Sequence, residues 1–180
     1  YVTNISIIIQ KENLGNATEA GFAISLFTFG TLVIGFFFGR MRQFWPNFNI
    51  PFGILLTAVG ILWCFFANNL MMINIASFLG GMGLGIVLPG VLARVSELSN
   101  VKKGISFVGF VAAAQGLGGI TSSFMYQFLL NITGQENGRF TLLLASIGLI
   151  ILAIAWTAVT TFRKEKDSRT PETPNTTHII

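Results

Sequence analysis

The feature that most constrains this chain is a set of five long apolar runs that hold no charged residue. They cover residues 20–39, 50–67, 70–93, 105–130 and 140–162, and all 11 Lys and Arg and all 7 Asp and Glu lie outside them. A helix needs about 20 apolar residues to cross a bilayer, and a charge at its centre costs roughly 2.5 to 3.5 kcal/mol. The sequence therefore predicts an all-α membrane protein with five transmembrane helices.

The overall composition supports a lipid environment and argues against several other classes. Hydrophobic residues make up 52% of the chain and charged residues only 10%, whereas a soluble domain has about 25% charged residues. The net charge of +4 lies in short groups beside the runs, without a basic stripe, which argues against a nucleic-acid partner. The single cysteine, Cys64, lies inside a run, so no intrachain disulfide can form.

Positive charge alternates from one connection to the next and predicts the orientation. Arg40 and Arg42 follow the first run, two lysines precede the fourth, and basic residues follow the fifth. Since Lys and Arg are retained on the cytoplasmic side, these connections are predicted to be cytoplasmic, in a multi-pass protein of the cell membrane. The first run then starts outside. We therefore expect residues 1–10 to be the stub of a truncated helix, and the chain to be the C-terminal part of something longer.

The expected domain organisation is a transmembrane bundle over residues 1–162 and a disordered cytoplasmic tail over 163–180. The tail is polar, with prolines and few apolar residues, and such a segment cannot bury enough apolar surface to fold alone. The bundle is expected to have the lipid bilayer as its surroundings.

Small residues recur at four-residue spacing within three of the runs. Residues at this spacing share a helix face, where a small side chain lets another helix approach closely and an interior proline kinks the helix. Tight packing is the favoured interpretation, and bending of the third helix is the alternative. The positions are Gly81, Gly85 and Pro89 in the third run, Gly35 and Gly39 in the first, and Gly118 with Ser122 in the fourth.

Three segments together resemble the second half of a major facilitator superfamily transporter. They are GFAISLFTFGTLVIGFFFGRMRQF (21–44), SFLGGMGLGIVLPGVLARVSEL (77–98) and KKGISFVGFVAAAQGLGGITSSFMYQFLL (102–130). The resemblance runs from the outer end of the family's helix seven to its helix twelve. It implies half of a 12-helix fold that packs against the N-terminal half of the same transporter.

The family's cytoplasmic loop motif is only partly matched. Gly35, Gly39, Arg40 and Arg42 align with it, but Gly39 stands where the family has an acid and Gln43 where it has the last arginine. Second-half copies of this loop are often degenerate, which agrees with the placement. Two interpretations of the arginines remain, namely a gating role and anchoring at anionic headgroups, which is worth about 1 kcal/mol each.

Polar side chains inside the runs are the candidate substrate contacts, because they are costly in lipid unless they face a partner or a water-filled cavity. The fourth run places Gln115, Ser122 and Tyr126 on one stripe, and the resemblance implies that this helix borders the central cavity. Alternatively, Tyr126 anchors at the interface and Gln115 bonds a neighbouring helix. Weaker candidates, whose hydroxyls can also bond their own helix, are Asn74, Ser77 and Phe78 on the third run and Ser25, Thr28 and Phe29 on the first.

The sequence lacks the residues that several types of chemistry require. The runs hold no titratable carboxylate, His, Lys or Arg, so a proton-coupling carboxylate is expected in the absent half. Lactose-permease-like symporters carry charges here, so the resemblance favours the drug-exporter branch. Neither a Walker loop nor a metal cluster is present, and no cofactor is expected. An intramembrane enzyme is not expected either, because the runs lack the groups that such chemistry needs.

The leading hypothesis from the sequence is a secondary active transporter that works by alternating access. It would export a small lipophilic or amphipathic compound in exchange for protons. The alternatives are an uptake permease of the same superfamily and a non-transporting membrane scaffold.

Overall fold

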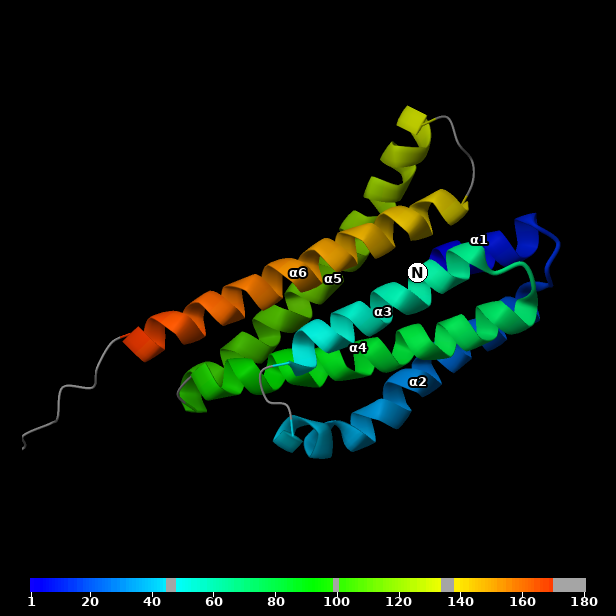
Figure 1. Cartoon of the computed structure of the whole chain (residues 1–180). Helices are drawn as coiled ribbons and strands as arrows, with labels where there is room; N and C mark the ends of the chain where they lie inside the picture. The colour runs from blue at the N-terminus through cyan, green and yellow to red at the C-terminus, as the bar shows by residue number, and fades with distance from the viewer. Residues whose placement is uncertain (45–47, 99–100, 134–137, 170–180) are drawn as a thin grey trace, which may run out of the picture.

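The structure, a computed structural model, describes residues 1–44, 48–98, 101–133 and 138–169. These residues form α-helices joined by short connections, with no strand among them (Figure 1). The helices are α1 (Val2–Lys11), α2 (Ala17–Phe44), α3 (Asn49–Phe66), α4 (Leu70–Leu98), α5 (Val101–Thr133) and α6 (Gly138–Arg169).

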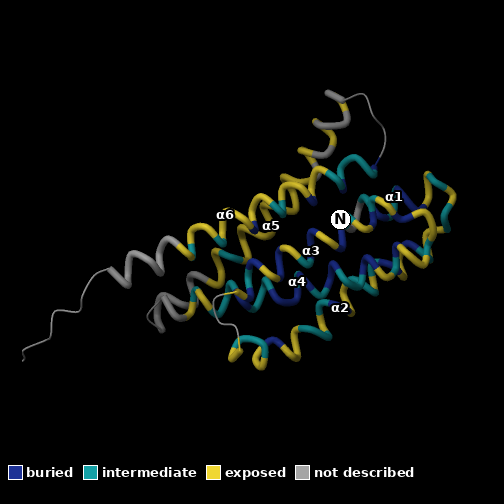
Figure 2. The backbone as a smooth tube through the Cα atoms, in the orientation of Figure 1, coloured by how far each residue is buried: buried dark blue, intermediate teal, exposed yellow. Residues whose placement is uncertain are grey.

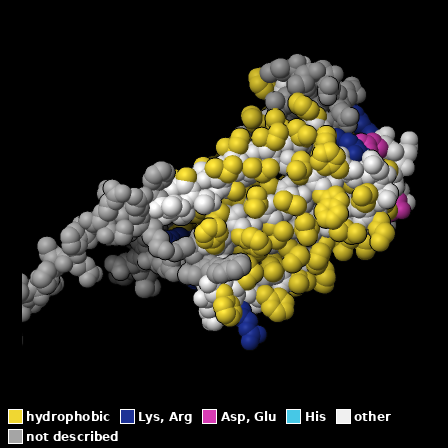
Figure 3. Space-filling model, viewed as in Figure 1, with side chains coloured by type: hydrophobic (Ala, Val, Ile, Leu, Met, Phe, Trp, Pro, Cys, Tyr) yellow, Lys and Arg dark blue, Asp and Glu magenta, His cyan; other side chains and the backbone are white. Residues whose placement is uncertain are grey.

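Four of the described helices are long and apolar enough to cross a membrane. The qualifying segments are Ala17–Phe44, Asn49–Phe66, Leu70–Ser96 and Gly138–Thr161, and α5 contributes the shorter apolar segment Val108–Ser122. In Figure 3, hydrophobic side chains cover the middle of the viewed face, and the described charged side chains lie toward its edges. The all-α membrane fold predicted from the sequence is confirmed.

Two helices extend past the runs from which they were predicted. α2 continues to Phe44, so that Arg40 and Arg42 lie in its last turns, and α6 continues to Arg169. The segments 40–44 and 163–169 contain neither Gly nor Pro, and their Arg, Lys and Glu residues favour helix. The predicted start of the tail at 163 therefore lies inside α6, whereas residues 170–180 lie outside the described residues.

Local polar contacts determine where several helices begin and end. Asn13 follows α1 with a φ of 53°, a left-handed conformation that Asn tolerates and that commonly ends a helix. α2 begins with a reciprocal capping box, in which Glu19 N–H donates to Asn16 Oδ1 over 3.0 Å and Asn16 N–H to Glu19 Oε2 over 2.7 Å. Asn69 caps α4 by accepting from Met72 N–H at 2.8 Å. These caps keep the connections short.

The central element of the bundle is α4, which lies between α2 and α3. The turn at Asn68 and Asn69 makes α3 and α4 an antiparallel hairpin, α6 packs on the other side of α3, and α1 contacts α2 and α6 (Figure 1). α5 meets α4 but adds little to the core, because all of its described side chains over residues 108–131 are exposed except the half-buried Val111 (Figure 2). The core is therefore made by the other helices.

The main buried cluster lies at one end of the bundle, where α1 and α3 end and α2, α4 and α6 begin. We call this the Arg139 end. Ile5, Ile8 and Ile9 of α1 are fully buried there, at the spacing that places side chains on one helix face. They belong to one cluster with buried residues of α2, α3, α4 and α6 and with Ala67, which directly follows α3. The helical members are Ala20, Ala23, Ile61, Cys64, Ile73, Ala76 and Leu142.

Glycines let α4 contact its two neighbours backbone to backbone. Gly81 faces the carbonyl of Phe27 on α2, and Gly85 faces that of Thr31 on the same helix. On the opposite side, Gly80 lies against Gly60 of α3. Small residues permit this close approach in a membrane bundle. A Cβ at Gly35, Gly39 or Gly118 would instead meet open space, so these glycines make no such contact within the described part of the chain.

A threonine strengthens the contact between α2 and α4, which leads to a first prediction. Thr31 Oγ1 donates to the carbonyl of Gly81 over 3.0 Å, besides reaching Phe27 O on its own helix at 3.1 Å. Hydrogen bonds between membrane helices average about 0.6 kcal/mol and reach about 1.7 kcal/mol. We expect Thr31→Val, which keeps the side-chain volume, to lower the free energy of unfolding by about 0.6 to 1.7 kcal/mol. The measurement is denaturant titration of the full-length protein in micelles.

Thr28 provides the matched control for this prediction. Its hydroxyl donates only to Ile24 O of the same helix, over 3.1 Å, and the residue is exposed. Thr28→Val should leave the free energy of unfolding unchanged within about 0.3 kcal/mol. Equal losses for the two variants would show that the bond to Gly81 adds nothing.

Candidate functional site

A group of polar and aromatic side chains meets inside the Arg139 end of the bundle. Ser77 of α4 is fully buried and donates to Ile73 O over 2.6 Å. The hydroxyl of Tyr1 therefore donates to Ser77 Oγ, 2.5 Å away, and lies 3.9 Å from Sγ of Cys64 on α3. The Tyr1 ring stacks on Phe27 of α2 with centroids 4.6 Å apart. We call Tyr1, Phe27, Cys64 and Ser77 the Tyr1 cluster.

The sequence selected Ser77 as a candidate contact but did not single out the other three members. One signal could have found Tyr1, because it lies four residues before Ile5, and Ile5 four before Ile9. Residues at this spacing share a helix face, so Tyr1 belongs to the buried face of α1. Cys64 and Phe27 show no comparable signal, since each lies among other apolar residues.

Asn74 carries a buried polar atom that has no hydrogen-bond partner among the described residues. Its Oδ1 accepts no hydrogen bond, and the residue lies one helical turn before Ser77 on α4. Buried polar atoms are nearly always bonded to protein or water, and in lipid the cost of leaving one unpaired is higher still. Asn49 at the start of α3 likewise has both side-chain polar atoms buried without a partner. Asn74 thus marks a position where a bound molecule could supply the missing bond.

The candidates on α2 lie on its exposed surface. Ser25 and Thr28 donate to carbonyls of their own helix, at 2.9 and 3.1 Å. Phe29 is 55% exposed, and its ring lies 6.1 Å from that of Phe78 on α4, in a tilted arrangement. Of these three residues, the structure brings Phe29 next to a candidate on α4.

The described candidates on α5, Gln115 and Ser122, lie on its exposed surface. Gln115 and Ser122 are exposed, and Ser122 donates to Gly119 O of its own helix over 2.8 Å. The side chain of Tyr126 lies outside the described residues. Arg40 is exposed and Arg42 half-buried near the end of α2, where a cation interacts favourably with the helix dipole.

The described side chains around α4 offer groups that can hold a small molecule. Within the described ranges, no three His, Cys, Asp or Glu residues lie close enough to hold a metal ion. What α4 and its neighbours offer is an amide, hydroxyls and aromatic rings in a bundle whose long apolar runs carry no charge. Such a surface can hydrogen-bond and stack on a small aromatic or amphipathic molecule.

Comparisons with known proteins place these features in a family. The chain is 27% identical over 151 residues to the benzoate transport protein of Acinetobacter baylyi, a match covering 81% of the chain and 32% of that protein. It is 26% identical to the gentisate transporter of Corynebacterium glutamicum (84% and 34%) and 23% identical to multidrug resistance protein 1 of Bacillus subtilis (84% and 40%).

The chain thus spans about a third of the length of these relatives. No solved structure matches it significantly. The sequence profile of the Major Facilitator Superfamily matches residues 1–178. With its apolar helices and the absence of strands among the described residues, the chain belongs to the Major Facilitator Superfamily.

Proposed function

We propose that this chain forms the C-terminal half of a secondary active transporter that moves small aromatic or amphipathic molecules across the cell membrane by alternating access. The N-terminal half of the same transporter would be its partner, and the segment after α6 would be cytoplasmic. The observation that carries the proposal is the unpartnered Oδ1 of Asn74, one turn from the buried hydroxyl of Ser77. A substrate that offers a hydrogen-bond donor would satisfy this oxygen.

Aromatic side chains support the proposed substrate class. Phe29 and Phe78 lie beside each other between α2 and α4, and aromatic pairs add about 0.5 to 1.5 kcal/mol beyond their area burial. Two of the relatives are named for benzoate and gentisate, and the third for resistance to many drugs. Gln115 and Tyr126 remain proposed contacts on α5, with Ser122 beside them.

We propose export in exchange for protons as the direction of transport. The second candidate is an uptake permease of the same superfamily, and it is favoured by two relatives that are each named for transport of one aromatic acid. Imposing a pH gradient on proteoliposomes of known orientation separates the two. Export by exchange requires substrate to move against the proton flow, whereas proton-coupled uptake moves it with the flow.

The proposed site leads to a second prediction, on transport. Asn74→Leu keeps the volume but removes the amide, so a substrate group that bonds Oδ1 loses its partner. Leaving a buried polar group unpaired costs about 1 to 3 kcal/mol. We expect kcat/KM of the full-length protein to fall roughly tenfold for radiolabelled gentisate, whose phenolic hydroxyls can donate to Oδ1, or for ethidium if that is the compound transported.

Ser146→Ala is the matched control for this transport assay. Ser146 is buried on α6 and donates only to Leu143 O of its own helix, over 2.7 Å. Its removal should leave kcat/KM within a factor of about two. Wild-type transport by a folded Asn74→Leu variant would remove Asn74 from the site, and failure of the wild type to move any aromatic compound would reject the substrate class.

A further inference from the structure

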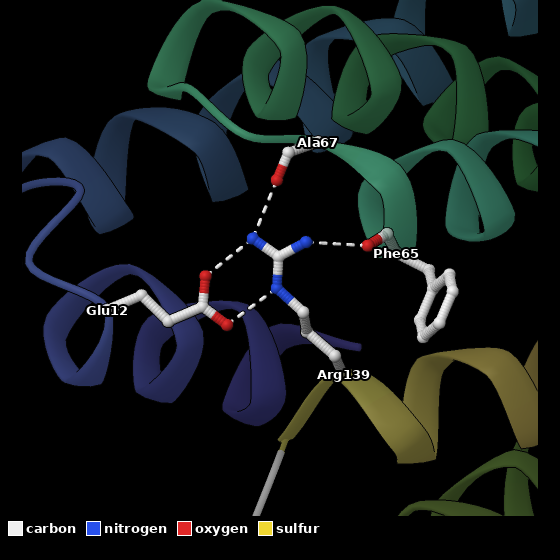
Figure 4. Close-up of polar contacts among 4 residues, drawn as sticks. All are labelled: Glu12, Phe65, Ala67 and Arg139. Atoms are coloured by element: carbon white, nitrogen blue, oxygen red, sulfur yellow. Dashed lines mark hydrogen bonds and ion pairs between the residues drawn. The ribbon is translucent and has the colours of Figure 1, made fainter.

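Arg139 joins three elements of the bundle through a single side chain (Figure 4). Its Nε and Nη2 donate to the two carboxylate oxygens of Glu12, both at 2.5 Å. Nη1 donates to Phe65 O over 2.6 Å, and Nη2 also donates to Ala67 O over 2.7 Å. Glu12 follows α1, Phe65 and Ala67 end α3, and Arg139 begins α6. We call this group the Arg139 clamp.

The physical chemistry of helix ends explains why an arginine occupies this position. The last carbonyls of a helix have no partner within it, and they carry the negative end of the helix dipole. The guanidinium satisfies two such carbonyls of the α3 end, while its fork binds the carboxylate of Glu12 in a bidentate manner. A lysine ammonium is a point charge without this planar fork. It could not reproduce the four contacts together.

Glu12 directly follows α1, and Tyr1 lies 11 residues earlier in the chain. The 10 residues of α1 span about 15 Å. Ile5, Ile8 and Ile9 pack along one face of this segment, and Asn13 turns the chain directly after Glu12. A shift or rotation of α1 at Glu12 would therefore displace Tyr1 from Cys64 and Ser77.

We propose that Arg139 is a positioning residue that fixes α1 against α3 and α6 and so holds Tyr1 over Cys64 and Ser77. Its relevance to transport rests on the proposed function, because Tyr1 lies beside the α4 polar residues to which substrate binding is assigned. Its effect on the position of α1 does not, since that effect can be measured without any substrate.

Cys64 provides a direct probe of the position of Tyr1. Its side chain is 1% exposed, and the Tyr1 hydroxyl lies against its sulfur. The experiment measures the rate of N-ethylmaleimide labelling in proteoliposomes, using the full-length protein with Cys64 as its only cysteine. Arg139→Gln, which removes the charge and most donors, should raise the rate at least tenfold. Arg139→Lys and Glu12→Gln, which each keep part of the clamp, should give intermediate rates.

A second cysteine position distinguishes a local displacement of α1 from a general loosening of the helix bundle. Thr57 is buried in the middle of α3, where it faces Gly83 of α4, two helical turns before Cys64. In a Cys64→Ala background, Thr57→Cys should label at the same rate, within a factor of two, whether or not the Arg139→Gln substitution is also present. Thr31→Val, which breaks the bond between α2 and α4, should leave Cys64 labelling unchanged to the same extent.

The outcomes decide the proposal. The proposal is supported if labelling becomes faster at Cys64 but not at Thr57→Cys. The rate at Cys64 must also be higher in Arg139→Gln than in Arg139→Lys, and higher in Arg139→Lys than in the wild type. Unchanged labelling of Cys64 in Arg139→Gln overturns it, and so does an equal rise at Cys64 and at Thr57→Cys. If the wild-type protein transported no compound, the proposed function would be rejected. The labelling result would still test the position of α1.

Discussion

Gly81→Ala is expected to lower the free energy of unfolding by more than about 3 kcal/mol. The added Cβ would overlap the carbonyl oxygen of Phe27 on α2 and lie 3.0 Å from Phe27 Cα. All of these atoms belong to backbone, so no rotamer change relieves the overlap. Overpacking usually costs about 1 to 3 kcal/mol and more where nothing can move. The helices α2 and α4 would have to separate, which also breaks the Thr31 hydrogen bond.

The measurement is denaturant unfolding of the full-length protein in micelles, with the yield of monodisperse protein as a second readout. Gly35→Ala is the matched control, because it changes the same residue type on α2 where a Cβ meets nothing within 4 Å. Alanine is a better helix former by about 0.5 to 1 kcal/mol, so this control should be neutral or slightly stabilising. Equal stability of the two variants would contradict the packing of α2 on α4.

Gly60→Ala should have an effect of similar size on the other side of α4. Its Cβ would lie 2.5 Å from Cα of Gly80, and closer still to the nitrogen of that residue, with Ala76 O at 2.9 Å. The contacted atoms are again backbone, here of α4. We expect a loss of about 3 kcal/mol, measured in the same unfolding experiment.

The partner glycine of this contact should behave differently, which makes the test specific to the geometry. A Cβ on Gly80 points toward the ring of Phe27, with Cε2 at 3.4 Å, and stays 3.8 Å from Cα of Gly60. That is an ordinary contact with a side chain. Gly80→Ala should therefore change the free energy of unfolding by less than about 1 kcal/mol. A greater loss for Gly80→Ala than for Gly60→Ala would show that α3 and α4 pack in another register.

The spacing of the glycines predicts which of them share a helix face, but not which helix packs against that face. Four-residue spacing placed Gly81 and Gly85 on one face of a helix, and in the structure both face α2. The same spacing at Gly35 and Gly39 leads to open space. Periodicity identifies residues that share a face, because that follows from helix geometry alone. It does not identify the helix that packs there, since this depends on how all helices are arranged.

In the candidate site, too, the sequence identified polar residues but not their partners. The sequence selected Asn74 and Ser77 because polar side chains stand out in a charge-free run. That Ser77 is bonded by Tyr1, whereas Oδ1 of Asn74 has no partner, depends on where α1 lies against α4. The selected stripe on α5 remains a prediction, as Tyr126 lies outside the described side chains.

The sequence by itself determined the helices and their membrane environment. A helix satisfies its backbone hydrogen bonds locally, so a charge-free apolar run of sufficient length is enough to specify it. Only the tertiary structure decided that the guanidinium of Arg139 binds Glu12, 127 positions earlier in the chain, together with the last carbonyls of α3. Such a contact exists only after three helices have packed, and no local pattern encodes it.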